Sequence, residues 1–264
     1  MRAFTADELD GQPAAVSLHT VPAALPATPA ADLPFPVPAA VLEARSSTPW
    51  DAFLPAHAGG WGWTLGRAVK RGLDIVLAVA GLVLLAPLFI VLALVVKLSS
   101  PGPIFYEWRV LGRHARPFRG WKFRTMVVNA DELKGEILAH NEMTGPAFKM
   151  RNDPRVTRAG RWMRKYSLDE LPQLWSVLKG DMSLVGPRPP GPHEFVHFAD
   201  WQRGKLAVTP GITCIWQVSG RSEIRDFDEW MRLDLEYIRN WSLRLDLAIL
   251  ARTLPAVFRG RGAY

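Results

Sequence analysis

Residues 75–96, IVLAVAGLVLLAPLFIVLALVV, decide the fold of this chain, because they form a long run without a charged or strongly polar side chain. At about 1.5 Å of rise per residue, a helix of this length would cross the roughly 30 Å hydrocarbon core of a bilayer. Pro87 lies near the middle, where it removes a helical hydrogen bond and bends the helix axis. Two structures follow as alternatives: a plain transmembrane helix, and a re-entrant hairpin that leaves the membrane on the side where it entered.

Basic residues on both sides of the run favour the hairpin. Lys and Arg prefer the cytoplasmic side of a membrane, and only a re-entrant segment keeps both flanks there. We therefore predict a re-entrant helix–break–helix in residues 61–100. The flanking basic residues are Arg67, Lys70, Arg71, Lys97, Arg109, Arg113, Arg116 and Arg119.

The segment before the hairpin is rich in Ala and Pro, as in VPAALPATPAADLPFPVPAA at residues 21–40. Recurrent Pro interrupts helices, and such a composition buries little apolar surface. The sequence therefore predicts a disordered arm over residues 1–60. Its start, MRAFTADELDG, has acids where a secretory signal has basic and then apolar residues, so we do not expect a signal peptide.

The net charge of +7 indicates anionic partners. Because no nucleic-acid-binding motif is visible, we expect lipid and nucleotide-sugar phosphates rather than nucleic acid. The single cysteine, Cys214, excludes an intramolecular disulfide, and eleven Trp residues suit a bilayer interface.

We expect residues 101–264 to form one small domain on the cytoplasmic side, where both flanks of the hairpin lie. Its expected short strands and several helices make the fold class helix-rich α/β. Short strands are expected at residues 104–106, 118–126 and 207–218, the last interrupted by a turn. Helices are expected at residues 127–141, 167–178, 226–241 and 242–258, the last two amphipathic and at the surface.

A candidate catalytic pair lies in RKYSLDELPQLWSVLKGDMSLVGPRP at residues 164–189. Asp169 and Glu170 are adjacent, and Arg188 follows in a Gly–Pro turn. One carboxylate could attack a phosphate, the other could hold a metal, and the arginine could bind phosphate oxygens. The structural alternative is a capping box from Ser167 to Glu170, with both acids at a helix start.

Basic residues bracket this pair in the sequence, several of them beside Gly or Pro turns, where a ligand can approach closely. Each could instead be an ordinary solvated residue or face anionic lipid. These candidates are Lys122, Arg124, Arg155, Arg164, Arg188 and Arg221.

A second possible site is Asp226-Phe-Asp228, which has the spacing that many glycosyltransferases use for a metal. Acids also favour the first turn of a helix, and that explanation is preferred here. The six His residues show no metal-ligand spacing.

Long collinear motifs resemble the bacterial sugar transferase family, the monotopic polyprenyl-phosphate phosphoglycosyl transferases that begin exopolysaccharide and O-antigen assembly. The resemblance covers residues 66–264. Its motifs are KRGLDI from residue 70, SPGPIFYEWRVLGR from 100, FRGWKFRTM from 118, DPRVTRAGRWMRKYSLDELPQLWSVLKGDMSLVGPRP from 153 and TPGITCIWQVSGR from 209.

The resemblance implies transfer of a sugar 1-phosphate, of galactose or glucose, from a UDP-sugar to undecaprenyl phosphate with release of UMP. It implies a monotopic protein of the bacterial cytoplasmic membrane that contacts membrane lipids, and it leaves the oligomeric state open, a dimer included. It also implies that Asp169 is the nucleophile and that Glu170 holds Mg²⁺. Substrate contacts are implied at Arg164, Arg188 and Arg221 for phosphate and at Lys122 and Arg124 near the nucleotide, and Arg155 is a further candidate.

Two rival functions remain. One is a metal-dependent glycosyltransferase that uses Asp226 and Asp228 and releases UDP. The other is a non-catalytic membrane component of a polysaccharide assembly machine, in which replacement of Asp169 would leave polymer synthesis intact.

Overall fold

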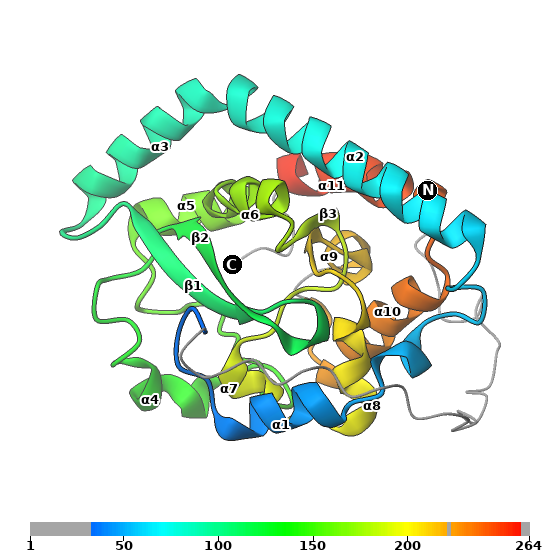
Figure 1. Ribbon diagram of the computed structural model, residues 1–264. Helices are drawn as coiled ribbons and strands as arrows, with labels where there is room; N and C mark the ends of the chain where they lie inside the picture. Colours follow the sequence, from blue (N-terminus) through cyan, green and yellow to red (C-terminus); the bar gives the residue numbers. More distant parts are fainter. Residues whose placement is uncertain (1–32, 221–222, 260–264) are drawn as a thin grey trace.

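In the computed structural model, which describes residues 33–220 and 223–259, a bent pair of long helices lies along one edge of the molecule and a β-hairpin lies inward of it (Figure 1). The hairpin consists of β1 (Phe105–Leu111) and β2 (Pro117–Phe123), and a parallel pair consists of β3 (Ser183–Val185) and β4 (Gly211–Thr213). The result is a helix-rich α/β fold with small sheets. The helices are α1 (Ala39–Ser47), α2 (Trp61–Leu84), α3 (Ala86–Ser99), α4 (Lys134–Ile137), α5 (Arg158–Lys165), α6 (Gln173–Lys179), α7 (Pro192–Phe195), α8 (Asp200–Arg203), α9 (Ile215–Ser219), α10 (Phe227–Arg239) and α11 (Leu243–Arg259), with 3-10 turns η3 (Trp50–Phe53), η4 (Arg113–Ala115), η5 (Leu138–His140), η6 (Leu168–Glu170) and η7 (Gly204–Ala207).

The long apolar run forms two helices instead of one. α2 and α3 meet at a bend of 63°, and Leu85 separates them. Pro87 lies in the first turn of α3, where its missing N–H costs no helical hydrogen bond. The helix break predicted from Pro87 is therefore confirmed. Within residues 33–220 and 223–259, no helix alone has the length and apolarity to cross a bilayer, whereas this bent pair meets both conditions together.

The strands predicted near residues 104–106 and 118–126 are confirmed, and they pair with each other. In the antiparallel register, Trp108 lies opposite Gly120 and Tyr106 lies opposite Lys122. The chain reverses through His114 and Ala115, whose φ angles are 55° and 54°. These left-handed conformations allow a tight turn that matches the twist of the two strands.

Tertiary contacts override two helix predictions. The helix predicted over residues 127–141 is wrong, because that segment holds only α4 and η5; the Val127 N–H instead donates to the Arg155 carbonyl. The helix predicted over residues 167–178 is broken into η6 and α6, since Ser167 has a φ of 52° and Pro172 precedes α6. By contrast, the helices predicted over residues 226–241 and 242–258 are confirmed as α10 and α11.

The segment predicted at residues 207–218 as an interrupted strand contains the end of η7, strand β4 and most of α9. The Pro210–Gly211 step does interrupt it, but β4 is only three residues long and a helix follows directly.

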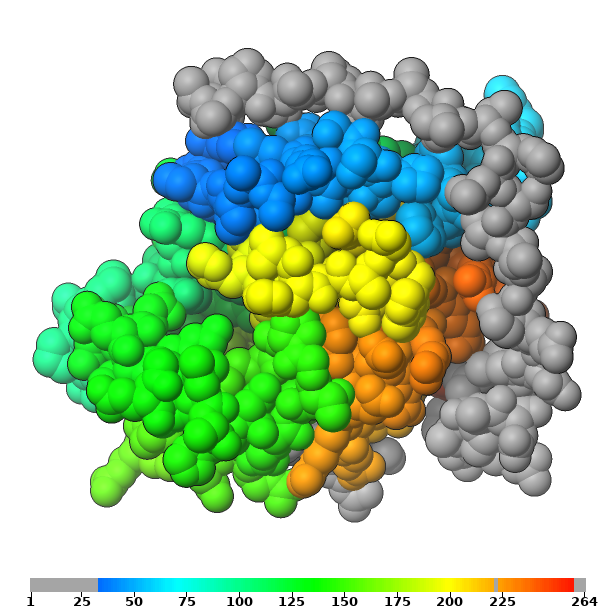
Figure 2. Space-filling view, turned by 90° about the horizontal axis from the view of Figure 1, so that it is seen from below, coloured from blue at the N-terminus to red at the C-terminus, as the bar shows by residue number. Residues whose placement is uncertain are grey.

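Disorder of the whole N-terminal arm is a wrong prediction for its second half. Residues 39–47 form α1, and Val41, Ala44 and Trp50 lie in a hydrophobic cluster with side chains such as Phe195 and Leu206. Figure 2 shows this blue segment lying against the yellow segment that contains α7 and α8. The prolines precede α1 and do not interrupt it, so the helix can form and bury its apolar residues. Residues 1–32 lie outside the described part of the chain.

We expect Trp50→Ala to destabilise the domain by about 3–5 kcal/mol, the usual cost of emptying a buried aromatic site. Trp50 is 5% exposed, stacks on His114 with ring centroids 5.5 Å apart, and donates from Nε1 to the Arg45 carbonyl. The thermal midpoint in detergent measures the effect, with the more exposed Trp201→Ala as the control. An unchanged midpoint for Trp50→Ala would show that the arm is not part of the core.

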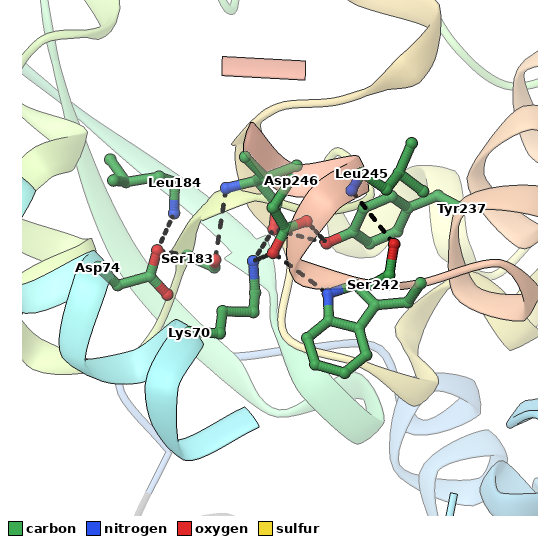
Figure 3. Close-up of polar contacts among 10 residues, drawn as sticks. Lys70, Asp74, Ser183, Leu184, Tyr237, Ser242, Leu245 and Asp246 are labelled. Carbon is green, nitrogen blue, oxygen red and sulfur yellow. Dashed lines mark hydrogen bonds and ion pairs between the residues drawn. The ribbon is translucent and has the colours of Figure 1, made fainter. Parts of the chain in front are cut away.

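A polar network joins α2 to the rest of the domain (Figure 3). Lys70 Nζ lies 2.7 Å from Asp246 Oδ2 and donates to the Val185 carbonyl at 2.9 Å, while the Tyr237 hydroxyl donates to Asp246 Oδ1 at 2.7 Å. One turn further along α2, the Asp74 carboxylate accepts from Ser183 Oγ and the Leu184 N–H. Lys70 and Asp74 of α2 are thus held by β3 and by the first turn of α11.

We expect Asp246→Asn to cost about 3 kcal/mol, because it leaves the largely buried Lys70 ammonium without its anionic partner. The loss should appear as a lower thermal midpoint and as faster proteolysis between α10 and α11. Asp200→Asn is the matched control, since the Asp200 side chain is 93% exposed. Equal midpoints for both variants would contradict a role of the network in holding α2.

Candidate active site

Asp169 and Glu170, the predicted carboxylate pair, line a cavity of about 1210 Å³ beside the β-hairpin. Side chains from both hairpin strands, from the η6 turn and from the loop after β3 line its wall. The cavity brings together residues that lie far apart in the sequence. Of the predicted site residues it contains Lys122, Arg124, Arg164, Asp169, Glu170 and Arg188.

Asp169 and Glu170 lie on the 3-10 turn η6, not in the first turn of one long helix. The capping-box explanation is wrong, because the Ser167 N–H donates to the Arg164 carbonyl and the Glu170 side chain reaches away to two cations. Instead, the left-handed Ser167 turns the chain so that both acids face the cavity.

Glu170 is held in an ion-pair network. Lys122 Nζ lies 2.8 Å from Glu170 Oε1, and Arg188 Nη1 lies 3.2 Å from the same oxygen. Burial alone would raise the pKa of Glu170, but the two cations outweigh it and lower the pKa to about 2. Glu170 is therefore ionised at any physiological pH.

Asp169 differs from its neighbour. Burial raises the pKa of Asp169, and the negative charge of Glu170 adds to that rise, while Lys122 and Arg164 oppose it. In the described part of the chain, no side chain donates a hydrogen bond to the Asp169 carboxylate, which is 8% exposed and lines the cavity. The two acids thus have different environments, which is how adjacent carboxylates take different roles.

Close backbone packing places Arg164 and Arg188. A Cβ on Gly160 of α5 would lie 2.1 Å from the Thr125 carbonyl oxygen, so glycine allows α5 to press against the end of β2, and Arg164 Nε donates to Thr125 Oγ1. A Cβ on Gly211 would lie 2.1 Å from the Gly186 nitrogen. This contact fixes the Gly–Pro turn that carries Arg188.

Arg124 and Arg155 brace the fold. Arg124 donates to the Pro103 and Ser100 carbonyls and to Ser100 Oγ, so it fastens the chain that leaves α3. Arg155 forms a buried two-point ion pair with Asp153, donates to the Ala130 carbonyl and does not line the cavity. The structure therefore does not bring Arg155 together with the other candidates in the cavity. Arg221 lies outside the described residues.

The alternative metal site at residues 226–228 is a helix start. Asp226 Oδ1 accepts the Asp228 N–H and caps α10, and Asp228 Oδ1 accepts from Gln202 Nε2 at 2.6 Å. Neither acid lines the cavity. The preferred explanation from the sequence is thus confirmed.

Glu170, the expected magnesium ligand, would hold the ion together with oxygens of a bound substrate. Across residues 33–220 and 223–259, no group of three or more His, Cys, Asp or Glu side chains could hold a metal by itself. Mg²⁺ is commonly bound by one or two carboxylates together with substrate phosphates and water. The Glu170 carboxylate, which lines an open cavity, could supply one such ligand.

Sequence reasoning missed several residues of the wall. Trp108 of β1 lines the cavity, and so do Phe35, Pro36 and Pro38 of the arm. The register of the predicted hairpin could have indicated Trp108, because residues two apart on a strand share a face. No sequence signal places the arm there.

Comparisons with known proteins agree on one family. The profile of the family described as "Bacterial sugar transferase" matches residues 65–260. An "Undecaprenyl-phosphate galactose phosphotransferase" of Salmonella typhimurium is 45% identical over 75% of this chain and 42% of its own length. A "UDP-glucose:undecaprenyl-phosphate glucose-1-phosphate transferase" of Escherichia coli is 38% identical, with the same two shares, and the "Exopolysaccharide production protein ExoY" of Rhizobium meliloti is 39% identical over 80% of this chain and 95% of its own length. The chain therefore spans less than half of the first two relatives and nearly all of the third.

Proposed function

The chain belongs to the bacterial sugar transferase family, and from this premise we propose that it transfers a sugar 1-phosphate from a UDP-sugar to undecaprenyl phosphate and releases UMP. The names of two relatives support galactose or glucose as the sugar. One observation carries the proposal: Lys122 and Arg188 hold Glu170, whereas Asp169 faces the same cavity with its carboxylate unbound by another described side chain.

In the first step, an Asp169 carboxylate oxygen attacks the phosphorus that bears the sugar. A new P–O bond forms to Asp169, the bond to the other phosphate breaks, and UMP leaves with the electron pair. Two anions must meet in this step, so Lys122 and Arg188 are needed to stabilise the phosphate oxygens.

In the second step, a phosphate oxygen of undecaprenyl phosphate attacks the same phosphorus and displaces Asp169 as a free carboxylate. The product is a lipid diphosphate sugar, and the enzyme returns to its starting state. Mg²⁺ held by Glu170 would cancel further negative charge on the diphosphate.

The proposal is tested with the donor alone and then with donor and lipid. Intact-protein mass spectrometry without lipid should show the mass of one hexose phosphate, and nucleotide analysis with lipid should show UMP. A panel of UDP-sugars identifies the sugar. Release of UDP without UMP would contradict the proposal and favour a glycosyltransferase that transfers the sugar without phosphate.

We also propose that α2 and α3 enter one leaflet of the cytoplasmic membrane and return to the cytoplasmic side. The bend and the apolar outer surface of the two helices support this placement; Val76, Val83, Ile90 and Leu98 are each more than half exposed. Gly59→Cys and Arg116→Cys test it, because both positions are exposed and the native Cys214 is buried. In intact cells both cysteines should resist a membrane-impermeant thiol reagent, and labelling of only one would indicate a crossing helix.

A further inference from the structure

Trp108 lies on the face of the β-hairpin that carries Lys122. Trp108 is opposite Gly120 and Tyr106 is opposite Lys122, so these four residues share one side of the two strands. A Cβ on Gly120 would lie 3.5 Å from Trp108 Cε3, so the indole covers the space that a side chain at Gly120 would fill. From there the ring reaches its diagonal neighbour Lys122, as long and aromatic side chains on adjacent strands can.

Two cations approach this one ring. Lys122 Nζ lies 4.0 Å from the Trp108 ring centroid, and Arg188 Cζ lies 5.4 Å from it. Both distances fall within the range of about 6 Å over which an aromatic face attracts a cation, and tryptophan is the strongest such partner. The same two cations bind Glu170 Oε1.

This arrangement affects how Lys122 and Arg188 respond when the UDP-sugar binds. Lys122 and Arg188 carry like charges, and Glu170 compensates both in the absence of a ligand. A diphosphate must draw the same two cations towards its own oxygens. The uncharged ring does not compete with the phosphates, so it can hold the cations in place while they exchange one anion for another.

We propose that Trp108 is a positioning residue, whose indole face holds Lys122 and Arg188 in the geometry that receives the diphosphate of the donor. This inference rests on the proposed function, since it assigns the diphosphate to the cavity beside Asp169. The inference predicts that diphosphate binding depends on the π electrons of the indole as well as on the volume that the ring fills.

The test compares Trp108→Met, Trp108→Phe and a Trp108 carrying ring fluorines, which keeps the shape of the indole but withdraws its π electrons. Trp201→Met is the control, because Trp201 lies outside the cavity. UDP is the binding probe, measured by calorimetry on the full-length protein in detergent. The kinetic probe is UMP release at varied UDP-sugar concentration.

We expect Trp108→Met to weaken UDP binding and lower kcat/KM about tenfold, mainly through KM, because the ring acts on phosphate binding. The fluorinated ring should fall between wild type and Trp108→Met, Trp108→Phe should recover most of the affinity, and Trp201→Met should match wild type. If Trp108→Met does not fold, the protein with the fluorinated indole at position 108 provides the test. Wild-type affinity with the fluorinated ring, or equal losses in Trp108→Phe and Trp108→Met, would overturn the inference.

The two proposals fail in different ways. If wild-type protein releases no UMP, the proposed function fails, and UDP binding still reports on the ring and its cations. If wild type releases UMP and the Trp108 variants behave like Trp201→Met, only the role of Trp108 fails.

Discussion

Asp169→Asn should abolish the phosphosugar adduct and lower kcat/KM by about 10⁴-fold or more, because an amide oxygen cannot replace the attacking carboxylate. The variant should fold at least as well as wild type. Burial and the charge of Glu170 both disfavour the ionised form of Asp169, and a neutral amide removes that cost. Loss of activity with an unchanged or higher thermal midpoint is therefore the expected result.

Asp181→Asn is the matched control, since Asp181 lies outside the cavity and pairs with Lys179 at the surface. UMP release and intact mass are measured for both variants beside wild type. Undiminished product formation by Asp169→Asn would remove the nucleophile from the mechanism. A non-catalytic role in polysaccharide assembly would be favoured instead if wild type formed neither adduct nor UMP while Asp169→Asn left polymer synthesis in cells intact.

Lys122→Met should lower kcat/KM by about 10²-fold, because it removes one of two cations that face the dyad and the incoming phosphates. Met fills a similar volume and cannot compensate charge. Arg188 alone would then offset Glu170, so we expect the pKa of Glu170 to rise above its wild-type value of about 2. The remaining activity should depend on pH more than wild-type activity does.

The direction of that pH effect follows from the higher pKa that we expect for Glu170 in Lys122→Met. In wild type, the lowered pKa of Glu170 keeps the carboxylate ionised throughout the range from about pH 7 to pH 5. In Lys122→Met, burial still disfavours the ionised form of Glu170, and only Arg188 remains to stabilise it. The Glu170 carboxylate therefore binds a proton at a higher pH than in wild type. The ratio of wild-type to variant kcat/KM should therefore grow as the pH falls through this range. Lys179→Met, a change in a surface ion pair, should leave the ratio near one; a ratio for Lys122→Met that stays constant with pH would contradict the coupling to Glu170.

Local features of the sequence were enough to predict part of the site and of the fold. Asp169 and Glu170 are adjacent in the chain, so any fold keeps them together. The hairpin strands and the helices over residues 226–241 and 242–258 follow from periodicity that neighbouring residues carry. Lys122 and Arg188 were also among the predicted residues, but their distances to Glu170 depend on the packing of separate segments.

Other features of the structure depend on contacts between distant segments and could not be predicted. Arg155 resembles other basic candidates in the sequence, yet Asp153 and the Ala130 carbonyl bind it outside the cavity. The arm is rich in Pro, yet α1 and η3 are ordered because Val41 and Trp50 fit a cluster built by residues 111–147 and 195–231. Isolated segments do not contain these partners, so their composition alone cannot show them.

The apolar run, its break near Pro87 and the adjacent pair of acids could be predicted from the chain alone, because each follows from covalent geometry or from side chains that are neighbours in the chain. By contrast, the cations that reach Glu170, the arginines that brace the fold and the position of Trp108 beside two cations depend on how distant segments pack. Electrostatic and cation–π energies depend on distances of a few ångströms between groups that are many residues apart. Those distances exist only after the hairpin, the η6 turn and the loop after β3 have packed around one cavity.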